Sequence, residues 1–554
     1  MERIIRILTT FLALGATALH GEVHRMATEA RLWIKVPADS PPLASIGTSR
    51  GAAVQAPWER DAEARKRLTE VTFPIRWWAW DEAVVSFTPA ADGRIELLLM
   101  GPWGEAVDGE TPRQEVLWDD VTANGAHIAN GGFDELENGG PAGWQSPWGD
   151  YLEPGAWPLA GAEARSGGGL GAAWMNRPLQ QFVDVRKGVP VDLTVHARAA
   201  KPPGFIEPKA LGKDTPAHRA ASRMKRGVNL GNGWEATPGE GWGVRFTVDD
   251  IDRIADEGFD HIRVPVAWHF RLTMRDGKAG IDPVFLAEIE PVLRRALDRK
   301  LRVMLNWHHF NDLTGDPAAH RARFIAGWEA ICRRFKNWPP ELYLELLNEP
   351  HSALAGETLN SLYQETVSAL RAIDPDRILV ASPGHWGAVR SLDLLRLPDD
   401  DRIIVTVHCY DPFQFTHQGA GWVGLQGLRG VIYPGPPEQA LELPPALADN
   451  HGVAAFLDAY NTRPAATNPS GPGPVREALE VAREWSSRFG RPVHLGEFGA
   501  YQVADDASRA RYLRDVRRLA EERSIPWTLW EWKAGFGYWD PTTKQPRFRA
   551  ALMK

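Results

Sequence analysis

The feature that most constrains the fold is a regular alternation of short apolar segments and amphipathic runs through the second half of the chain. Eight apolar segments have the composition of buried strands: 227–230, 261–266, 302–307, 342–347, 377–381, 403–408, 492–496 and 527–532. Helical periodicity fills most of the intervals between them: 248–257, 283–298, 318–335, 357–372, 474–489 and 508–522. Because parallel strands need crossover connections, this order predicts an α/β fold, a (β/α)8 barrel, over residues 218–554.

The first part of the chain has a different pattern. Between residues 22 and 200, short alternating runs such as 83–87 and 94–99 are broken by glycine and proline. This pattern is typical of a β-sandwich, so we predict an N-terminal all-β sandwich domain over 22–200. A proline-rich stretch without periodicity, 201–217, is predicted to be a linker.

The first residues resemble an export signal. Arg3 and Arg6 precede an apolar run, 7–14, and the small residues 16–18 follow it. This order predicts a signal peptide over 1–21 and a secreted or periplasmic protein. The apolar run is too short to cross a bilayer, so we expect no stable membrane insertion.

Charge and aromatic content bear on the partner. Lys and Arg number 63 against 71 Asp and Glu, a net charge of −8, which disfavours a nucleic acid partner. The 24 tryptophans favour a polysaccharide or oligosaccharide, because flat aromatic faces stack on sugar rings. The two cysteines, Cys332 and Cys409, have neither metal-ligand spacing nor a disulfide pattern. We therefore expect a monomer stabilised by packing.

Carboxylates stand at the ends of two predicted strands. The fourth ends LELLNEP, with Asn348 and Glu349, and the seventh ends HLGEFGAY, with Glu497. Strands four and seven face each other across a barrel mouth, so the two glutamates are expected to converge there. Hydrolysis of a glycosidic bond with retention needs such a pair, one acid and one nucleophile. Taken singly, each glutamate could instead cap the following helix or face solvent.

Other polar and aromatic residues are expected at the same rim. Arg263 on the second strand would keep a neighbouring carboxylate ionised. The remaining candidates are His308 and His309 after the third strand, His408 and Tyr410 on one face of the sixth, and Trp530 on the eighth. Metal binding is the alternative interpretation for the histidines. However, no cysteine cluster, HExxH motif or group of aspartates accompanies them, so we expect no metal and no other cofactor.

A series of motifs in order carries a family resemblance: RGVNLGNGWEA, IRVPVAW, NWHH, LNEP, HCYDPFQFTHQG, LGEFGAY and LWEWKAGFGYWD. From about Arg226 onward, the chain resembles glycoside hydrolase family 5, whose members are (β/α)8 retaining enzymes. The resemblance implies Glu349 as general acid/base and Glu497 as nucleophile. It also implies supporting or substrate-contacting roles for Asn348, Arg263, His308, His408, Tyr410 and Trp530, and secondarily for Asn232, Glu235 and His309.

Two positions depart from the family pattern. Cys409 stands where relatives often have an aromatic or aliphatic residue, and we expect its side chain to point away from the cleft. Trp234 precedes Glu235 where a smaller aliphatic residue is usual. The long Gly- and Pro-rich stretch 411–473 follows the sixth strand, a place where barrels build substrate clefts.

The expected mechanism is double displacement. Glu349, its pKa raised by the Glu497 charge, donates a proton while Glu497 forms a glycosyl ester. Once the ester has formed, Glu349 can activate water. The resulting interpretation is a retaining endo-β-1,4-glucanase acting on cellulose-type or mixed-linkage glucan or on glucomannan. A β-mannanase of the same family and a non-catalytic glycan-binding protein are the alternatives.

The front region has its own resemblance. Residues 130–144 resemble the opening of β-sandwich carbohydrate-binding modules, and 181–199 resemble their middle strands. Residues 115–121 resemble a closing strand but come earlier in the chain. These pieces could complete one sandwich in permuted order or belong to two incomplete units. Four tryptophans could bind glycan if exposed, or could instead fill packing interfaces: Trp77, Trp78, Trp80 and Trp103.

Overall fold

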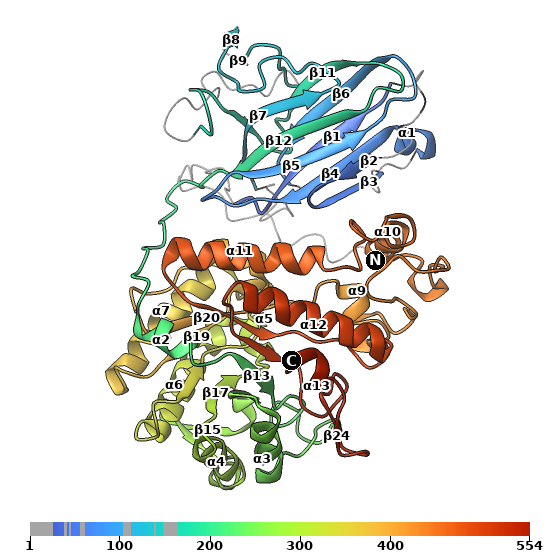
Figure 1. The fold of residues 1–554 in the computed structure, drawn as a ribbon. Helices are drawn as coiled ribbons and strands as arrows, with labels where there is room; N and C mark the ends of the chain where they lie inside the picture. Colours follow the sequence, from blue (N-terminus) through green and yellow to red (C-terminus); the bar gives the residue numbers. More distant parts are fainter. Residues whose placement is uncertain are drawn as a thin grey trace, which may run out of the picture. The chain divides into compact units, whose positions relative to one another are not determined.

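The computed structural model describes residues 26–37, 41, 43, 46–55, 61–102, 112–137, 140–147 and 164–554. The chain divides into two compact units, Met1–Phe205 and Ile206–Lys554, and each has its own β-architecture (Figure 1). The predicted signal peptide, 1–21, and Trp103 lie outside the described residues. Among the described residues, no helix combines the length and apolar character needed to cross a membrane.

The first unit contains two five-stranded sheets. One has the order β11-β6-β1-β4-β3, made of Leu179–Val185, Gly93–Met100, Glu29–Lys35, Leu68–Pro74 and Ala52–Gln55. The other has the order β10-β7-β12-β5-β2, made of Gly171–Ala173, Val116–Asn124, Val191–Ala199, Asp81–Phe87 and Ile46–Thr48. Strand pairing is antiparallel in both sheets. The helix α1 (Ala62–Arg67) and the short pair β8 (Leu136–Glu137) and β9 (Gly140–Pro141) complete this unit's described elements.

Alternating burial along the strands makes the sandwich core. In β5 the residues DEAVVSF alternate between buried and more exposed positions, as a strand with one face in the core requires. Phe73 of β4 meets Trp118 of β7 edge-on, with ring centroids 6.1 Å apart, so side chains of the two sheets meet in one interior. β7 pairs with β12, so the motif pieces 115–121 and 181–199 belong to one sandwich and not to two incomplete units.

Of the four tryptophans for which glycan contact and packing were both left open, Trp77, Trp78 and Trp80 lie in the described residues. Trp77 is only 2% exposed. Trp78 and Trp80 are partly buried, with the guanidinium groups of Arg76 and Arg198 lying 4.7 and 5.1 Å from their ring centroids. Trp77 is therefore a packing residue of this unit, and Trp78 and Trp80 each have an arginine near the ring.

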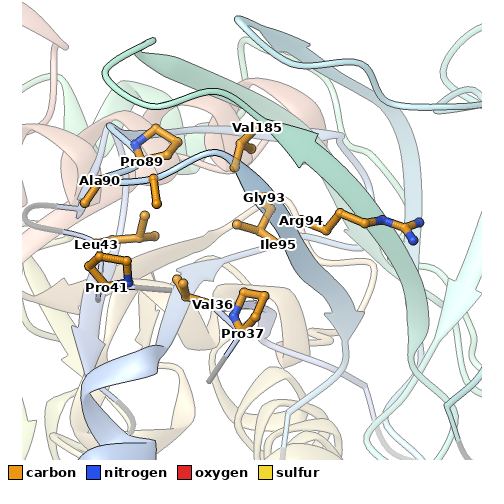
Figure 2. A pocket seen from close by; sticks show the side chains of 11 residues that line it. Val36, Pro37, Pro41, Leu43, Pro89, Ala90, Gly93, Arg94, Ile95 and Val185 are labelled. Carbon is orange, nitrogen blue, oxygen red and sulfur yellow. The ribbon is translucent and has the colours of Figure 1, made fainter. Parts of the chain in front are cut away.

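A small apolar hollow lies where the end of β1 meets the turn before β6 (Figure 2). It is lined by side chains such as Val36, Leu43, Ile95 and Val185, and its volume is about 10 Å³. That is about the space one water molecule needs, so the hollow has no room for an organic ligand.

The second unit is built on a closed barrel of eight parallel strands. In order these are β13 (Arg226–Asn229), β14 (His261–Val266), β17 (Arg302–Trp307), β18 (Leu342–Glu345), β19 (Leu379–Ala381), β20 (Ile403–His408), β21 (Val493–Glu497) and β22 (Trp527–Leu529). The predicted barrel is confirmed, with the bounds of β14, β17 and β20 as predicted. The eighth strand ends at Leu529, three residues before the predicted end, and β19 begins two residues late.

The main helices between these strands are α3 (Val248–Glu257), α4 (Pro283–Asp298), α6 (Pro317–Phe335), α7 (Gly356–Ile373), α11 (Gly473–Phe489) and α12 (Asp506–Glu522). Their ends follow ordinary capping chemistry. Thr247 and Asp250 form a capping box at the start of α3, and Gly258 ends it in the left-handed conformation, with φ of 95°.

A short helix closes the amino-terminal end of the barrel. α2 (Pro216–Ala221) begins inside the stretch predicted as linker, because Thr215 caps it and proline occupies its first position. Its Ala217 and Ala220 pack with Met304 and Ile404, which belong to barrel strands.

The barrel interior contains a polar layer. His261 and His494 both hydrogen-bond to the Thr528 hydroxyl, with N–O distances of 2.8 and 2.7 Å, and His494 also contacts Thr406 at 3.1 Å. Gly227 makes room for this layer, because a Cβ there would collide with the His261 ring.

The excursion after β20 is partly helical. It contains α9 (Phe413–Thr416), η4 (Gly421–Val423), η5 (Pro445–Leu447) and α10 (His451–Thr462). Smaller elements elsewhere in the unit are η2 (Trp268–Phe270), β15 (Leu272–Arg275), β16 (Lys278–Ile281), α5 (Asn311–Gly315), α8 (Gly384–Gly387), η3 (Val389–Leu394), β23 (Trp539–Asp540), β24 (Gln545–Pro546) and α13 (Arg549–Leu552).

Candidate active site

Two carboxylates converge at the carboxyl ends of β18 and β21. Glu349 follows β18 by four residues, and Glu497 is the last residue of β21. An oxygen of Glu349, an oxygen of Glu497 and a ring nitrogen of His408 all lie within 4.8 Å of one another. Carboxyl groups about 5–5.5 Å apart suit direct attack on a sugar carbon, whereas inverting sites separate them by about 6.5–9.5 Å.

Glu497 is surrounded by donors. Arg263 Nη1 donates to its Oε1 at 2.7 Å, and the Tyr410 hydroxyl donates to its Oε2 at 2.9 Å. Burial raises the pKa of Glu497, while the Arg263 charge and the Tyr410 hydrogen bond lower it. These two contacts stabilise the ionised form, as expected for Arg263 and Tyr410 from the sequence.

Arg263 is fully buried at the centre of a network. Its guanidinium forms a two-point pair with Glu345 at 2.6 and 2.7 Å. It also donates to Asn348 Oδ1 at 2.6 Å and to Asn229 Oδ1 at 2.9 Å. Glu345 and Asn229 were not predicted. The sequence offered one signal, because LELLNEP places the charged Glu345 between leucines of an apolar strand. A buried charge of this kind needs a partner of opposite charge.

Glu349 has a different environment. Its Oε1 lies 2.7 Å from His408 Nδ1, and its side chain keeps 25% of its exposure, so it reaches the cleft. Burial raises the pKa of Glu349 to about 7. Arg263 lowers this pKa and the neighbouring Glu345 carboxylate raises it further, while the repulsion between Glu349 and Glu497 contributes to the raised pKa of Glu497. A carboxyl with this pKa retains a proton near neutral pH.

His408 is held as a neutral imidazole beside Glu349. Burial lowers its pKa to about 4. The residue before the nucleophile candidate is Gly496, where a Cβ would lie 3.1 Å from His408 Nε2 and collide with Thr406. A larger residue at this position would therefore displace the Thr406 hydroxyl and crowd the imidazole.

A stacked pair forms one wall of the site. The His308 and Trp530 rings are parallel within 8°, with centroids 5.5 Å apart, and His308 Nδ1 lies 2.9 Å from Asn306 Oδ1. Burial lowers the pKa of His308 well below its usual range, so this ring is neutral. His309 is exposed and meets the His308 ring edge-on at 4.4 Å.

Comparison with known proteins agrees with this geometry. A family model described as Cellulase (glycosyl hydrolase family 5) matches residues 224–535, more than half of the chain and almost all of the barrel. The chain belongs to glycosyl hydrolase family 5. Among relatives of this family, Endoglucanase C of Acetivibrio thermocellus is 30% identical over 330 residues, covering 56% of this chain and 91% of that protein.

Other similar proteins extend the comparison. Endoglucanase H of Acetivibrio thermocellus is 27% identical over 324 residues, and Endoglucanase 3 of Fibrobacter succinogenes is 24% identical over 376 residues. The chain spans only 31% and 56% of their respective lengths. The solved structure of endoglucanase Cel5A from Thermotoga maritima is 32% identical, with a TM-score of 0.52 over 61% of this chain and all of that chain.

Two of the residues for which the sequence implied substrate contact, Asn232 and Glu235, hydrogen-bond to each other. Glu235 is 2% exposed, and its carboxylate accepts the backbone N–H groups of Asn232 and Gly233. Asn232 itself has a left-handed φ of 61°, which this carboxylate stabilises. The Glu235 carboxylate thus shapes the loop after β13, and its contact with substrate stays a prediction.

The two departures from the family pattern are both buried. Trp234 is 4% exposed and donates its Nε1–H to Glu288 at 2.8 Å, so its bulk lies inside the protein. Cys409 is 3% exposed, and its sulfur lies 3.9 Å from Asp411. The prediction that Cys409 points away from the cleft agrees with this burial. Both Cys332 and Cys409 are free thiols.

Exposed aromatic residues on the loops of the same barrel were not predicted as site residues. Trp386 is 54% exposed and stacks on His351, two residues from Glu349, with centroids 4.9 Å apart. Trp422 is 62% exposed and meets Tyr501 edge-on at 4.9 Å. Isolated tryptophans in loops without strand periodicity give no sequence signal for such placement.

One side-chain group could in principle hold a cation. Across the described residues, Glu349, His408 and Glu497 form the single cluster of three or more potential ligands. In this cluster His408 hydrogen-bonds to Glu349, and Glu497 accepts hydrogen bonds from Arg263 and Tyr410. The absence of a metal cofactor stays a prediction.

Proposed function

We propose that this chain is a retaining endo-β-1,4-glucanase with Glu497 as nucleophile and Glu349 as general acid/base. The observation that supports this most directly is that a carboxylate oxygen of Glu349 and one of Glu497 lie within 4.8 Å of each other. Glu497 is held by Arg263 and Tyr410, while burial raises the pKa of Glu349 to about 7. One group is therefore equipped to attack and the other to donate a proton.

In the first step, Glu497 attacks the anomeric carbon and Glu349 protonates the departing glycosidic oxygen. The C–O bond to the leaving sugar breaks as an ester bond to Glu497 forms. Trp530, stacked on His308, offers the face on which the sugar rests. Asn348, oriented by Arg263, has its amide N–H groups available for a hydroxyl of the bound sugar.

In the second step, Glu349 takes a proton from water as the water attacks the ester. Each carboxyl raises the pKa of the other while both carry charge, and esterification removes the charge of Glu497. The pKa of Glu349 then falls, which suits its change from acid to base. Two displacements at one carbon retain its configuration.

The proposed substrate is a β-1,4-glucan. The relatives named endoglucanase favour glucan over mannan, and the presence of both carboxylates favours catalysis over simple glycan binding. Because a polysaccharide cannot enter a cell, we also propose that the protein acts outside the cytoplasm, in a secreted or periplasmic location. Relative rates on barley β-glucan, carboxymethylcellulose and galactomannan test the substrate class.

Substitution of the nucleophile tests the mechanism. Glu497→Gln should abolish turnover, a loss of about 10⁴-fold or more, and leave substrate binding intact. Azide should restore turnover to Glu497→Ala and yield a product of inverted configuration. Near-normal hydrolysis by either variant without azide would refute the assignment. For the intact protein, kcat/KM should fall above about pH 7, where Glu349 loses its proton.

A further inference from the structure

The N-terminal unit has a groove beside β11, the edge strand of its first sheet. Its volume is about 420 Å³, within the range of about 300–1,000 Å³ of small-molecule sites. Residues 143–145 continue the sheet along this edge, since Gln145 and Gln180 exchange two backbone hydrogen bonds, at 3.0 and 2.7 Å. The groove thus has a floor fixed by sheet geometry.

A row of hydrogen-bonding side chains crosses the sheet at this place. Gln145 Nε2 donates to Gln180 Oε1 at 2.9 Å, and Gln180 Nε2 donates to Glu96 on β6. Gln180 is 5% exposed, which fixes its orientation, and Gln145 is exposed at the groove's edge. Each amide still has an N–H and a lone pair beyond these bonds. The row can therefore bond hydroxyl groups that both donate and accept.

An aromatic ring stands next to this row. Phe182 lies two residues from Gln180 on β11, so both side chains leave the same face of the strand. It is 44% exposed, whereas phenylalanines such as Phe73 and Phe87 of this unit are buried. The Arg94 guanidinium lies 5.4 Å from its ring centroid and leaves much of the ring accessible. An exposed flat ring beside fixed amides is suited to a sugar ring, which has one apolar face and polar edges.

The charges of the groove balance. Arg94 lies 3.4 Å from Asp184, and both side chains are largely exposed. Glu96 is paired with Lys35 at 3.6 Å. The arginine and the aspartate that line the groove, Arg94 and Asp184, offset each other, so the groove offers no net attraction for a polyanion, which favours a neutral ligand.

We propose that this groove binds a neutral oligosaccharide chain, with one sugar ring on Phe182 and its hydroxyl groups bonded to Gln145 and Gln180. The choice of β-glucan as its ligand rests on the proposed function of the barrel. In the described residues the groove is formed entirely within the first unit, so it is separate from the Glu349 and Glu497 site.

Affinity electrophoresis of the full chain in gels that contain barley β-glucan tests this site. Glu497→Gln is used as the background, so that the polymer is not cleaved. Adding Phe182→Ala or Gln180→Ala should raise the dissociation constant measured in the gel about tenfold. Phe182→Ala removes the stacking contact with the sugar, and Gln180→Ala removes hydrogen bonds to its hydroxyl groups. The matched control is Leu136→Ala, which removes a 56% exposed apolar side chain of the same unit that does not line the groove.

These measurements distinguish oligosaccharide binding in the groove from the proposed hydrolysis in the barrel. With Glu497 intact, Phe182→Ala should leave kcat/KM on a short soluble cello-oligosaccharide unchanged. Unchanged retardation of both groove variants, at an unchanged melting temperature, would overturn the groove while leaving hydrolysis untouched. Stronger retardation by a sulfated glycan than by β-glucan would overturn its neutral character. A wild-type chain that fails to hydrolyse β-glucan but loses retardation on Phe182→Ala would refute only the proposed catalysis.

Discussion

Arg263 links the Glu497 carboxylate of the candidate site to the barrel core. Its guanidinium contacts Glu345 at two points and reaches Glu497 and Asn348 with its remaining donors. A guanidinium suits this place because its planar fork presents several donors in fixed directions. The orientation of the nucleophile candidate thus depends on Glu345, a residue that is itself remote from the cleft and fully buried.

Glu345→Gln should destabilise the protein strongly, because it leaves the buried Arg263 charge without its two-point partner. We expect a loss of about 3–5 kcal/mol in the free energy of unfolding, measured by urea denaturation. Glu365→Gln is a matched control, since Glu365 also lies 2.6 Å from an arginine Nε, that of Arg321, but at the surface. Its loss should be below about 1 kcal/mol. Equal losses in the two variants would contradict the network.

Tyr410→Phe should move the acidic limb of the pH profile upward. The hydroxyl stabilises the ionised form of Glu497, so its removal raises the pKa of that carboxyl, and a higher pH is then needed to ionise it. Loss of a hydrogen bond to a charged group should lower kcat about 10- to 100-fold. The measurement is kcat/KM against pH.

Tyr512→Phe is the control for that experiment. Its hydroxyl is buried and has no hydrogen-bond partner among the described residues. Both the pH profile and kcat should match those of the unmodified protein. An acidic limb that stays in place in Tyr410→Phe would show that this hydroxyl does not act on the nucleophile candidate.

The carboxylate pair could be predicted from sequence because barrel topology brings every strand's carboxyl end to one rim. Glu349 and Glu497 stand at such ends, and so do His408 and Trp530. Glu345 lies inside a strand, where the side-chain direction depends on the register of the closed barrel. Burial of Glu235 depends on how the loop folds back on itself, which local pattern does not encode.

At the scale of elements, loops after the strands hold the site by close packing. Glu531 follows Trp530 and accepts backbone N–H groups of Lys533, Ala534 and Phe536, which fixes the loop after β22. Burial raises the pKa of Glu531 to about 7. The loop after β13 approaches closely at Gly231, where a Cβ would lie 2.9 Å from the Trp530 ring.

Gly231→Ala should therefore displace Trp530 and weaken catalysis. A shift of about 1 Å at a sugar platform reduces kcat/KM about 100-fold. Gly473→Ala is the control, because no atom lies within 4 Å of the added Cβ at the start of α11. The readouts are kcat/KM on β-glucan and the melting temperature. Unchanged kinetics in Gly231→Ala would remove Trp530 from the proposed site.

Strands and long helices followed their sequence periodicity closely, whereas the excursion after β20 did not. Helix α10 forms among glycines and prolines because Asn450 caps it, with its side chain accepting the Val453 N–H at 3.0 Å, and because Phe456 and Tyr460 are buried. Such a helix is stabilised mainly by tertiary packing, so a pattern search of the surrounding loop misses it.

At the scale of the whole molecule, the two units have separate cores. We expect calorimetry of the full chain to resolve two unfolding transitions. Trp118→Ala, which removes a fully buried ring from the sandwich, should lower only one transition, and Glu345→Gln should lower only the other. A single transition that both variants shift would contradict this independence.

Buried histidines of the barrel unit set a limit on acid tolerance. His494 and His308 are buried as neutral rings with pKa values well below their usual range, because burial disfavours their charged forms. An unfolded chain would protonate both near pH 6.5, so each drop in pH below that value favours unfolding. Long exposure to mild acid should thus inactivate the protein by loss of structure, at pH values where Glu349, the proposed acid, is protonated.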